Sequence, residues 1–266
     1  MCIRDRPKGA RLRHKLETIL HKAHRKRGYE PVRGPEILKA DMWRTSGHYA
    51  CYGENMYLTT IDEQEYGVKP MNCIGHIQIF KQTGKSYRDL PLKYYEYGVV
   101  HRHEKSGALH GLLRVREFTQ DDAHIFCTPE QIASEVIDVV EFVDSVMKLF
   151  GFEYTMEVAT KPEKAIGEDM VWELATNGLK KALDENNLPY KIDEGGGAFY
   201  GPKIDVKITD ALGRKWQCGT IQVDFNLPER FGVEYVAEDN SRRQLVMIHR
   251  AILGSFERFI AILTEH

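Results

Sequence analysis

A row of polar side chains lies between residues 117 and 127, in a segment whose apolar ends favour a β-strand. Alternate residues of a strand share one face, so Gln120, Asp122 and His124 would lie together, with Phe118 and Phe126 on either side. Burying hydrogen-bonding side chains is costly unless a partner satisfies them. We therefore expect a binding site on this face. A solvated outer face of the sheet is the alternative.

The residues before this row predict the other arm of a β-hairpin, so that residues 99–126 form two strands joined by a long basic loop. Arg102 and Glu104 are two residues apart near the end of the first arm and would project the same way. The planar guanidinium of Arg102 suits bidentate contact with a phosphate, and Arg114 and Arg116 add positive charge. This pattern suggests a triphosphate site, although a solvated basic loop explains it equally well.

Two further segments carry polar residues where a core is expected. Residues 195–203 form a glycine-rich turn with Tyr200 and Lys203, but the spacing is neither that of a P-loop nor G-x-G-x-x-G. The strand expected next places Cys218, Thr220 and Gln222 on one face. Taken alone, the glycine-rich segment is no more than a turn, and the polar strand is the stronger indication of a site.

Cysteine and histidine residues could hold a metal, but no spacing rule connects them. Cys73, His124 and His249 are far apart in sequence, so each taken singly is better read as a core or surface residue. The chain has five cysteines, an odd number, with no C-x-x-C pair. This usage indicates a reducing compartment with free thiols or a thiolate ligand, and it argues against a disulfide framework.

The composition is that of an ordinary globular protein. The chain has 266 residues, of which 42% are hydrophobic and 29% charged, and its net charge is −2. Any contact with nucleic acid would thus come from local patches and not from a global basic field. No apolar run approaches the roughly 18 residues that span a membrane. The charged start has no signal-peptide core, so we expect a cytoplasmic location and no membrane partner.

Hydrophobic periodicity predicts helices and strands without the regular alternation of a parallel sheet. The expected helices are 10–27, 37–43, one beginning at 73–79, 129–150, 173–185 and 257–264. Residues 45–55 are expected to be a loop. The expected strands are a hairpin over 57–69, then 92–100, 153–159, 190–194, 203–209, 215–224 and 245–250. We therefore expect one α+β domain, with a mainly antiparallel sheet flanked by helices.

In combination these segments resemble the catalytic domain of class II aminoacyl-tRNA synthetases, and within that class the threonyl-tRNA synthetases. Residues 29–35, ending in Pro35, look like motif 1; residues 101–124 look like motif 2; and residues 254–258 look like motif 3. The most specific strings are KPMNC, SYRDLPL, LHGLLRVREFTQDDAHIF, GAFYGPKID, WQCGTIQ and MIHRAILGS. The resemblance implies an antiparallel sheet of six or seven strands ringed by helices, and a homodimer formed through motif 1.

The resemblance also implies roles at an ATP site. Arg102 would hold the α-phosphate, and Glu104 would contact the adenine side. Phe118 and Arg258 would sandwich the adenine ring, which combines stacking with a cation–π contact. Arg114 and Arg258 would grip the β- and γ-phosphates, and magnesium would bridge the phosphates.

A zinc ion is implied for the amino-acid site. The family holds it with one cysteine and two histidines, which match Cys73, His124 and His249. Three protein ligands leave room for a substrate, here the amino and hydroxyl groups of threonine. Asp122 would accept a hydrogen bond from that hydroxyl, and Tyr200 would contact the amino group. Valine has no hydroxyl and would be rejected.

The resemblance gives further residues supporting roles. Gln217 would help to position ATP, Gln120 and Lys203 would lie at the carboxylate of threonine, and His48 would assist transfer to the tRNA ribose. A surface-loop histidine is the alternative for His48. The substrate-contacting residues outside the zinc site are Gln120, Asp122, Tyr200, Cys218 and Gln222. The implied partners are ATP, L-threonine and tRNA(Thr), and the implied enzyme is a threonine–tRNA ligase.

The sequence departs from the family pattern in a few places. Ile74 follows Cys73 where proline is common, and His103 replaces a common asparagine. Residues 7–266 correspond to the catalytic domain, whereas residues 1–6 are expected to be an unrelated leader or artefact. N-terminal domains, including an editing domain, and an anticodon-binding domain are expected to be missing, which suggests a fragment. A non-catalytic paralogue and a synthetase specific for serine or proline are the alternatives.

Overall fold

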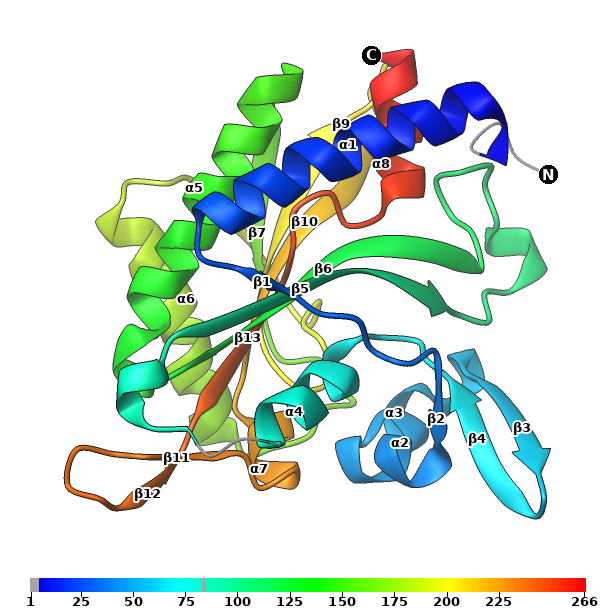
Figure 1. Ribbon diagram of the computed structural model, residues 1–266. Helices are drawn as coiled ribbons and strands as arrows, with labels where there is room; N and C mark the ends of the chain where they lie inside the picture. The colour runs from blue at the N-terminus through cyan, green and yellow to red at the C-terminus, as the bar shows by residue number, and fades with distance from the viewer. Residues whose placement is uncertain (1–4, 83–84) are drawn as a thin grey trace.

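The computed structural model describes residues 5–82 and 85–266, which form a twisted sheet with helices packed on both faces (Figure 1). Residues 1–4, which make up most of the leader expected over residues 1–6, lie outside the described residues. The helices of the described part are α1 (Pro7–Lys26), α2 (Ala40–Ser46), α3 (His48–Tyr52), α4 (Cys73–Lys81), α5 (Ile132–Phe150), α6 (Asp169–Glu185), α7 (Asn226–Arg230) and α8 (Phe256–Glu265).

Eight strands form the main sheet of the described part, in the order β1-β5-β6-β13-β10-β9-β7-β8. Only the outer pairs β1–β5 and β7–β8 are parallel, so the predicted α+β class with a mainly antiparallel sheet is confirmed. The count of six or seven strands was too low. The strands are β1 (Glu30–Pro31), β5 (Leu92–His101), β6 (Glu117–Cys127), β7 (Tyr154–Ala159), β8 (Tyr190–Asp193), β9 (Lys203–Thr209), β10 (Lys215–Asp224) and β13 (Val246–Ala251).

Two small sheets complete the described strands. β2 (Ile37–Lys39), β4 (Gln64–Val68) and β3 (Tyr57–Ile61) form a three-stranded sheet, and β11 (Glu234–Val236) pairs with β12 (Arg242–Gln244). The hairpin predicted over 57–69 is thus confirmed as β3 and β4. None of the predicted elements corresponds to α7, β11 or β12, which are short and lack clear periodicity.

The two faces of the sheet pack against different helices. Ile125 and Phe126 are neighbours on β6 and therefore point to opposite faces. Ile125 joins an apolar cluster with residues from α1, α5, α6 and α8. Phe126 joins a second cluster, which includes residues of α4 and α7. The polar row of β6 shares the face of Phe126, so it lies away from the large helices α1 and α5.

The predicted start of the longest apolar helix is confirmed in detail. Thr128 and Gln131 form a capping box around a 3₁₀ turn, Pro129–Gln131, from which α5 continues. In this motif a hydroxyl and a side-chain amide satisfy backbone N–H groups that have no partner in the first helical turn. α5 ends at Phe150, and the next residue, Gly151, has a φ of 75°, which suits a left-handed helix terminus.

The region from residue 37 to residue 55 differs from the prediction. The expected helix 37–43 begins as a strand, because Ile37–Lys39 pairs with Val68, Gly67 and Tyr66 of β4. The expected loop 45–55 contains α3 and a 3₁₀ turn. Gly47 separates α2 from α3 with a φ of 84°, which is costly for residues other than glycine.

No helix of the described part is both long and apolar enough to cross a bilayer.

Candidate active site

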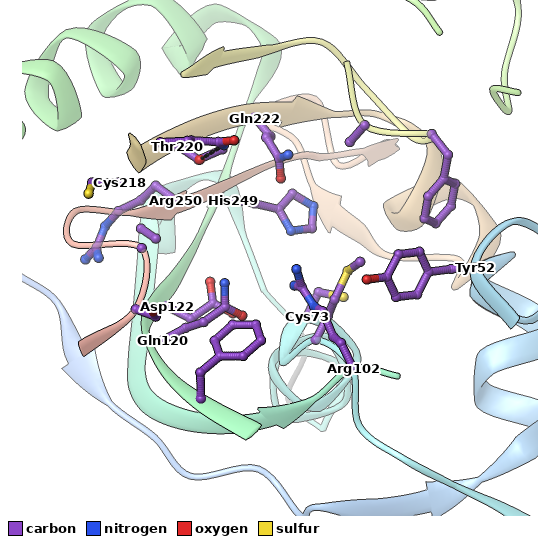
Figure 2. Close-up of a pocket in the computed structure, with 18 of the residues that line it drawn as sticks. Tyr52, Cys73, Arg102, Gln120, Asp122, Cys218, Thr220, Gln222, His249 and Arg250 are labelled. Carbon is purple, nitrogen blue, oxygen red and sulfur yellow. Dashed lines mark hydrogen bonds between the residues drawn. The ribbon is translucent and has the colours of Figure 1, made fainter. Parts of the chain in front are cut away.

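A cavity of about 640 Å³ lies over the polar row of β6. Its walls come from the β5–β6 hairpin, the start of α4, β10, β13 and the glycine-rich turn before β9. Figure 2 shows Gln120 and Asp122 on one side of this cavity, Thr220 and Gln222 on the opposite side, and His249 between them. The sheet register explains this arrangement, because His249 is directly opposite both His124 on β6 and Gln222 on β10.

The guanidinium of Arg102 is held from several sides. Its Nε donates to the carbonyl oxygen of Pro70 at 3.1 Å. Its central carbon lies 5.1 Å from the ring centroid of Phe118 and 5.9 Å from that of Tyr52, which is within cation–π range. The side chain is therefore fixed at the cavity wall, as Figure 2 shows, with donors left for an anionic ligand.

The basic loop contains its own counter-charge. Nε and Nη2 of Arg114 donate to Oε2 of Glu104 at 3.1 and 3.0 Å. Arg116 Nε donates to the backbone oxygen of Glu104 at 3.0 Å. Of these three residues, Arg114 and Glu104 line the cavity. The geometry thus places Arg114 next to the site but pairs it with a carboxylate.

Arg258 joins three parts of the cavity wall. Its Nη1 donates to the backbone oxygen of Gln217 at 2.6 Å, and its Nε to that of Leu113 at 3.0 Å. Burial, together with the nearby charges of Arg114 and Arg102, lowers the pKa of this guanidinium from its ordinary value. α8 begins beside the cavity, where Ser255 caps the helix by accepting the N–H of Arg258 at 3.2 Å.

The other end of the cavity has polar groups suited to a small ligand. Nδ2 of Asn72 donates to Oδ2 of Asp122 at 2.9 Å. Burial raises the pKa of Asp122 from its ordinary value. The hydroxyl of Tyr200 donates to Oε1 of Gln222 at 2.7 Å, and burial raises the pKa of Tyr200 well above its usual value. Gln120 lines the same region.

Cys73, His124 and His249, the three expected metal ligands, all line the cavity. The rings of His124 and His249 have centroids 4.7 Å apart. Nε2 of His249 lies 2.8 Å from Oδ2 of Asp224. Burial lowers the pKa of His124 well below its ordinary value, which favours the neutral imidazole that can bind a metal. Within residues 5–82 and 85–266, however, no three cysteine, histidine or acidic side chains are positioned to hold a metal ion.

Two of the predicted site residues are not among the described residues that line the cavity. Lys203 instead forms an ion pair with Asp205 on the same strand. His48 is fully buried, so the alternative of a surface histidine is wrong. Its Nε2 lies 3.1 Å from Sδ of Met71 and 3.9 Å from Sγ of Cys73. His48 therefore lies behind the cavity wall, whereas Lys203 lies beside it, directly opposite Gln222 of β10.

Sequence reasoning assigned no site role to several residues that line the cavity. Tyr52 was missed because α3 was expected to be a loop, and Lys164 lies in an irregular segment without a motif. Arg250 directly follows His249 and is almost fully buried. A charged residue within an apolar strand is a signal that could have drawn attention to it.

Comparisons with known proteins agree with this architecture. Residues 57–266 match the sequence family described as the tRNA synthetase class II core domain (G, H, P, S and T). The chain belongs to this family of class II synthetase core domains.

Its similarity to threonine-specific relatives is high. The Threonine–tRNA ligase of Sulfurovum sp. (strain NBC37-1) is 86% identical over 260 residues, which are 98% of this chain and 43% of that protein. The Threonine–tRNA ligase of Campylobacter hominis is 72% identical over the same shares of the two chains. This chain therefore spans under half the length of these relatives.

A solved structure is also similar. It is titled as the RNA binding domain of threonyl-tRNA synthetase from Cryptosporidium parvum Iowa II. It superimposes with a TM-score of 0.96 at 48% identity, covering 98% of this chain and 66% of the other. The predicted resemblance is thereby confirmed.

Proposed function

We propose that this chain is the catalytic core of a threonine–tRNA ligase. It would join L-threonine to ATP, giving threonyl-adenylate and pyrophosphate, and then transfer threonine to the 3′ end of tRNA(Thr). The observation that carries the proposal is the placement of Arg102 and Arg258 in the same cavity as Asp122, Tyr200 and the Cys73–His124–His249 set. Relatives of this name at 72–86% identity support the same activity.

The arginines suit the activation step. An oxygen of the threonine carboxylate would form a bond to the α-phosphorus of ATP, and the bond from that phosphorus to the bridging oxygen would break. Pyrophosphate would leave with the electron pair. Arg102, already fixed against Phe118, would stabilise the negative charge that develops on the α-phosphate. Arg258 and Arg114 would bind the departing phosphates, with magnesium accompanying ATP.

The remaining ATP contacts follow from the cavity wall. Phe118 and Arg258 would hold the adenine ring between them, and Glu104 would contact its polar edge. Gln217 lines the cavity, and its side-chain amide donates to Oδ1 of Asp205 at 2.6 Å. Lys203 pairs with the same aspartate. We therefore place Lys203 in a supporting role, which it exerts through Asp205 and Gln217.

Selection of threonine would depend on the hydroxyl group. Asp122 would accept its hydrogen bond, and Tyr200, with Gln222 behind it, would contact the amino group. Gln120 would lie at the carboxylate, and Cys218 on the adjoining wall. A site built around a hydroxyl discriminates strongly against an analogue that lacks one, since buried polar groups would then be left unpaired. Valine would be rejected for this reason.

The donor set of Cys73, His124 and His249 fits a zinc ion in its chemistry, with one sulfur and two imidazole nitrogens. One nitrogen of each ring is already engaged, His249 Nε2 by Asp224 and His124 Nδ1 by His76. Such partners are usual for histidines that bind metals. Each ring keeps its other nitrogen for a metal. When bound, zinc would supply coordination positions for the amino and hydroxyl groups of threonine.

Transfer to tRNA would complete the reaction. A ribose hydroxyl oxygen would form a bond to the carbonyl carbon of threonine, and the bond from that carbon to the phosphate oxygen would break. AMP would leave with the electron pair, and the hydroxyl proton would pass to the departing phosphate. His48 packs near Phe199, with ring centroids 5.1 Å apart. Burial lowers the pKa of His48 to about 3. We propose that His48 assists the transfer by holding this part of the wall.

A homodimer through residues 29–35 is part of the same proposal. In this segment β1 pairs in parallel with β5 at the edge of the main sheet. Pro35, at the end of this segment, is exposed. The next two residues, Glu36 and Ile37, are exposed as well, Ile37 to 53%. Sedimentation velocity would show a mass of twice 30.7 kDa if the dimer forms.

Threonine-dependent exchange of pyrophosphate into ATP tests the proposal. We expect exchange with threonine, little with valine, weaker exchange with serine, and loss of exchange after zinc is removed by a chelator. Restoration by added zinc would tie the loss to the metal. Absence of exchange from a folded, zinc-loaded protein would contradict the proposed activity. Charging of tRNA is a separate assay, because it tests only the second step.

A further inference from the structure

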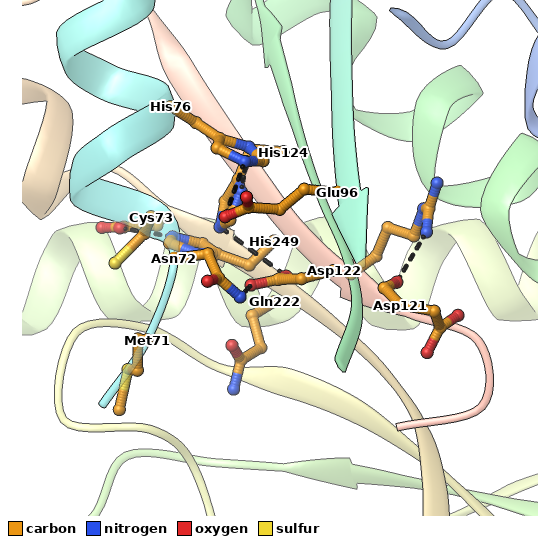
Figure 3. A network of polar contacts seen from close by, with 12 residues as sticks. Met71, Asn72, Cys73, His76, Glu96, Asp121, Asp122, His124, Gln222 and His249 are labelled. Atoms are coloured by element: carbon orange, nitrogen blue, oxygen red, sulfur yellow. Dashed lines mark hydrogen bonds and ion pairs between the residues drawn. The ribbon is translucent and has the colours of Figure 1, made fainter. Parts of the chain in front are cut away.

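A chain of buried polar groups lies behind His124, on the side away from the cavity. Nδ1 of His76, on α4, is 2.8 Å from Nδ1 of His124 (Figure 3). The ring of His76 is fully buried, and the two rings meet edge to face with centroids 4.6 Å apart. Neither His76 nor Glu96, the carboxylate next to it, is among the described residues that line the cavity.

Glu96 on β5 is the next member of this chain. Its Oε1 lies 3.5 Å from Nε2 of His76 and 3.5 Å from Nζ of Lys69. Its Oε2 accepts the backbone N–H of Gly34 at 3.0 Å. Burial raises the pKa of this carboxyl, but His76, Lys69 and the N–H of Gly34 together bring it below its ordinary value. Glu96 is therefore an ionised acceptor in a buried position.

The contact between two Nδ1 atoms restricts the protonation of both rings. One Nδ1 must donate and the other must accept, because a hydrogen bond needs one proton. If His124 binds a cation through Nε2, its proton is on Nδ1, so His76 accepts at Nδ1. A neutral His76 then carries its own proton on Nε2, which faces Glu96.

The contact between His76 and Glu96 is not a full hydrogen bond in the described structure. At 3.5 Å the contact between Nε2 of His76 and Glu96 is too long for a well-formed hydrogen bond. Within the described residues this nitrogen has no other hydrogen-bond partner. An unpaired buried N–H is costly, and a small movement of the ring toward Glu96 would remove that cost.

We propose that His76 is a positioning residue, which orients His124 for metal binding, and that Glu96 anchors His76. This inference rests on the metal site of the proposed function. His76 fixes which nitrogen of His124 faces the cavity, and Glu96 fixes the tautomer of His76. The arrangement also links the metal ligand to Gly34, one residue before Pro35 in the segment assigned to the dimer.

The test uses the full chain and measures zinc affinity by competition with a chromophoric chelator. His76→Leu removes the acceptor, and we expect about 10- to 100-fold weaker zinc binding, the usual effect of losing such a partner. His76→Asn keeps an acceptor oxygen and should recover part of the loss. Glu96→Gln should weaken binding by a smaller factor. His24→Leu is the matched control, because His24 is equally buried but does not line the cavity.

A spectroscopic readout separates positioning from general destabilisation. The protein is loaded with cobalt in place of zinc, and its visible absorption is compared between the variants. A changed spectrum is expected for His76→Leu and an unchanged one for His24→Leu. Equal affinity and an identical spectrum in wild type and His76→Leu would overturn the inference, as would equal losses for Leu and Asn. If His76→Leu does not fold, the zinc affinities of His76→Asn and Glu96→Gln test the inference instead. Wild-type affinity in both variants would overturn it. Failure of wild type to bind zinc would instead overturn the metal site of the proposed function.

Discussion

Gly98 on β5 lies directly against the side chain of Asn72, which donates to Asp122. A Cβ atom at Gly98 would lie 2.4 Å from Oδ1 of Asn72, far closer than two such atoms can approach. The bond from Asn72 to Asp122 is 2.9 Å long. The absence of a side chain at residue 98 therefore leaves the space that Asn72 occupies while it donates to Asp122.

Gly98→Ala should displace Asn72 and loosen Asp122. We expect a loss of about 1–3 kcal/mol in the free energy of unfolding, typical of overpacking, and about a tenfold rise in the KM for threonine in pyrophosphate exchange. Gly178→Ala is the control, since a Cβ there meets nothing within 4 Å. An unchanged KM for Gly98→Ala would show that Asn72 does not position Asp122.

His24 should make stability depend on pH. Burial and the charge of Arg250 lower its pKa from 6.5 to about 2 in the folded chain. Below pH 6.5 the unfolded chain binds a proton that the folded chain does not, so the free energy of unfolding falls as the pH falls. The expected slope is about 1.4 kcal/mol per pH unit.

His24→Leu should remove this contribution. Urea denaturation between pH 6.5 and 4.5 should show wild type losing about 2–3 kcal/mol more than the variant. Parallel pH profiles for the two proteins would show that His24 is protonated in the folded chain or exposed to solvent.

Arg250 is a buried cation whose loss should be severe. Its Nε donates to the hydroxyl of Tyr29 at 3.3 Å and its Nη1 to the backbone oxygen of Asp121 at 3.2 Å. Burial raises the pKa of Asp121, and the charge of Arg250 is the largest effect that limits this rise, which ends at about 6. Arg250→Met should cost about 3–5 kcal/mol in urea denaturation, because it leaves that carboxyl without its counter-charge.

Tyr29→Phe is the graded comparison for Arg250→Met. It removes only the hydroxyl, so a loss of about 1 kcal/mol is expected. Equal losses in the two variants would show that the charge of Arg250 contributes nothing beyond this single bond.

Arg258→Lys should impair catalysis more than folding. A lysine cannot donate to both Gln217 and Leu113 in the fixed directions that the guanidinium does. We expect kcat for pyrophosphate exchange to fall about 10²- to 10³-fold, because transition-state charge loses a fixed donor. The free energy of unfolding should fall by only about 1–2 kcal/mol through the lost backbone contacts. A fall in apparent ATP affinity alone, with kcat intact, would limit Arg258 to ground-state binding.

Sequence periodicity located the sheet well, because its strands have their own apolar patterns. The bounds expected for β9 and β10 agree with the structure residue for residue. The misread part, residues 37–55, depends on contacts distant in sequence. Ile37–Lys39 is a strand only because β4 pairs with it, and Trp43 on α2 is fully buried under that sheet. Local propensity contains no information about such partners.

The candidate site likewise has a part that the sequence could predict and a part that it could not. The row Gln120, Asp122 and His124 could be read from alternation along one strand. His249 could not be joined to it, because 124 residues separate His124 from its neighbour and only the β6–β13 register brings them together. Resemblance to a family supplied that connection. The roles of His76 and Arg250 required the three-dimensional arrangement. His76 lies in none of the family strings, and Arg250, although it lies within MIHRAILGS, had been given no role.

The pairing of Arg114 with Glu104 has a consequence for which anions can enter the cavity. The guanidinium that would receive a phosphate is neutralised by a carboxylate of the same loop at 3.0 Å. A small free anion must compete with that carboxylate for a single contact. A nucleotide that reaches Phe118 and Arg258 at the same time gains other contacts while it displaces Glu104. If the cavity binds ATP as proposed, this exchange of partners would favour a nucleotide over inorganic phosphate.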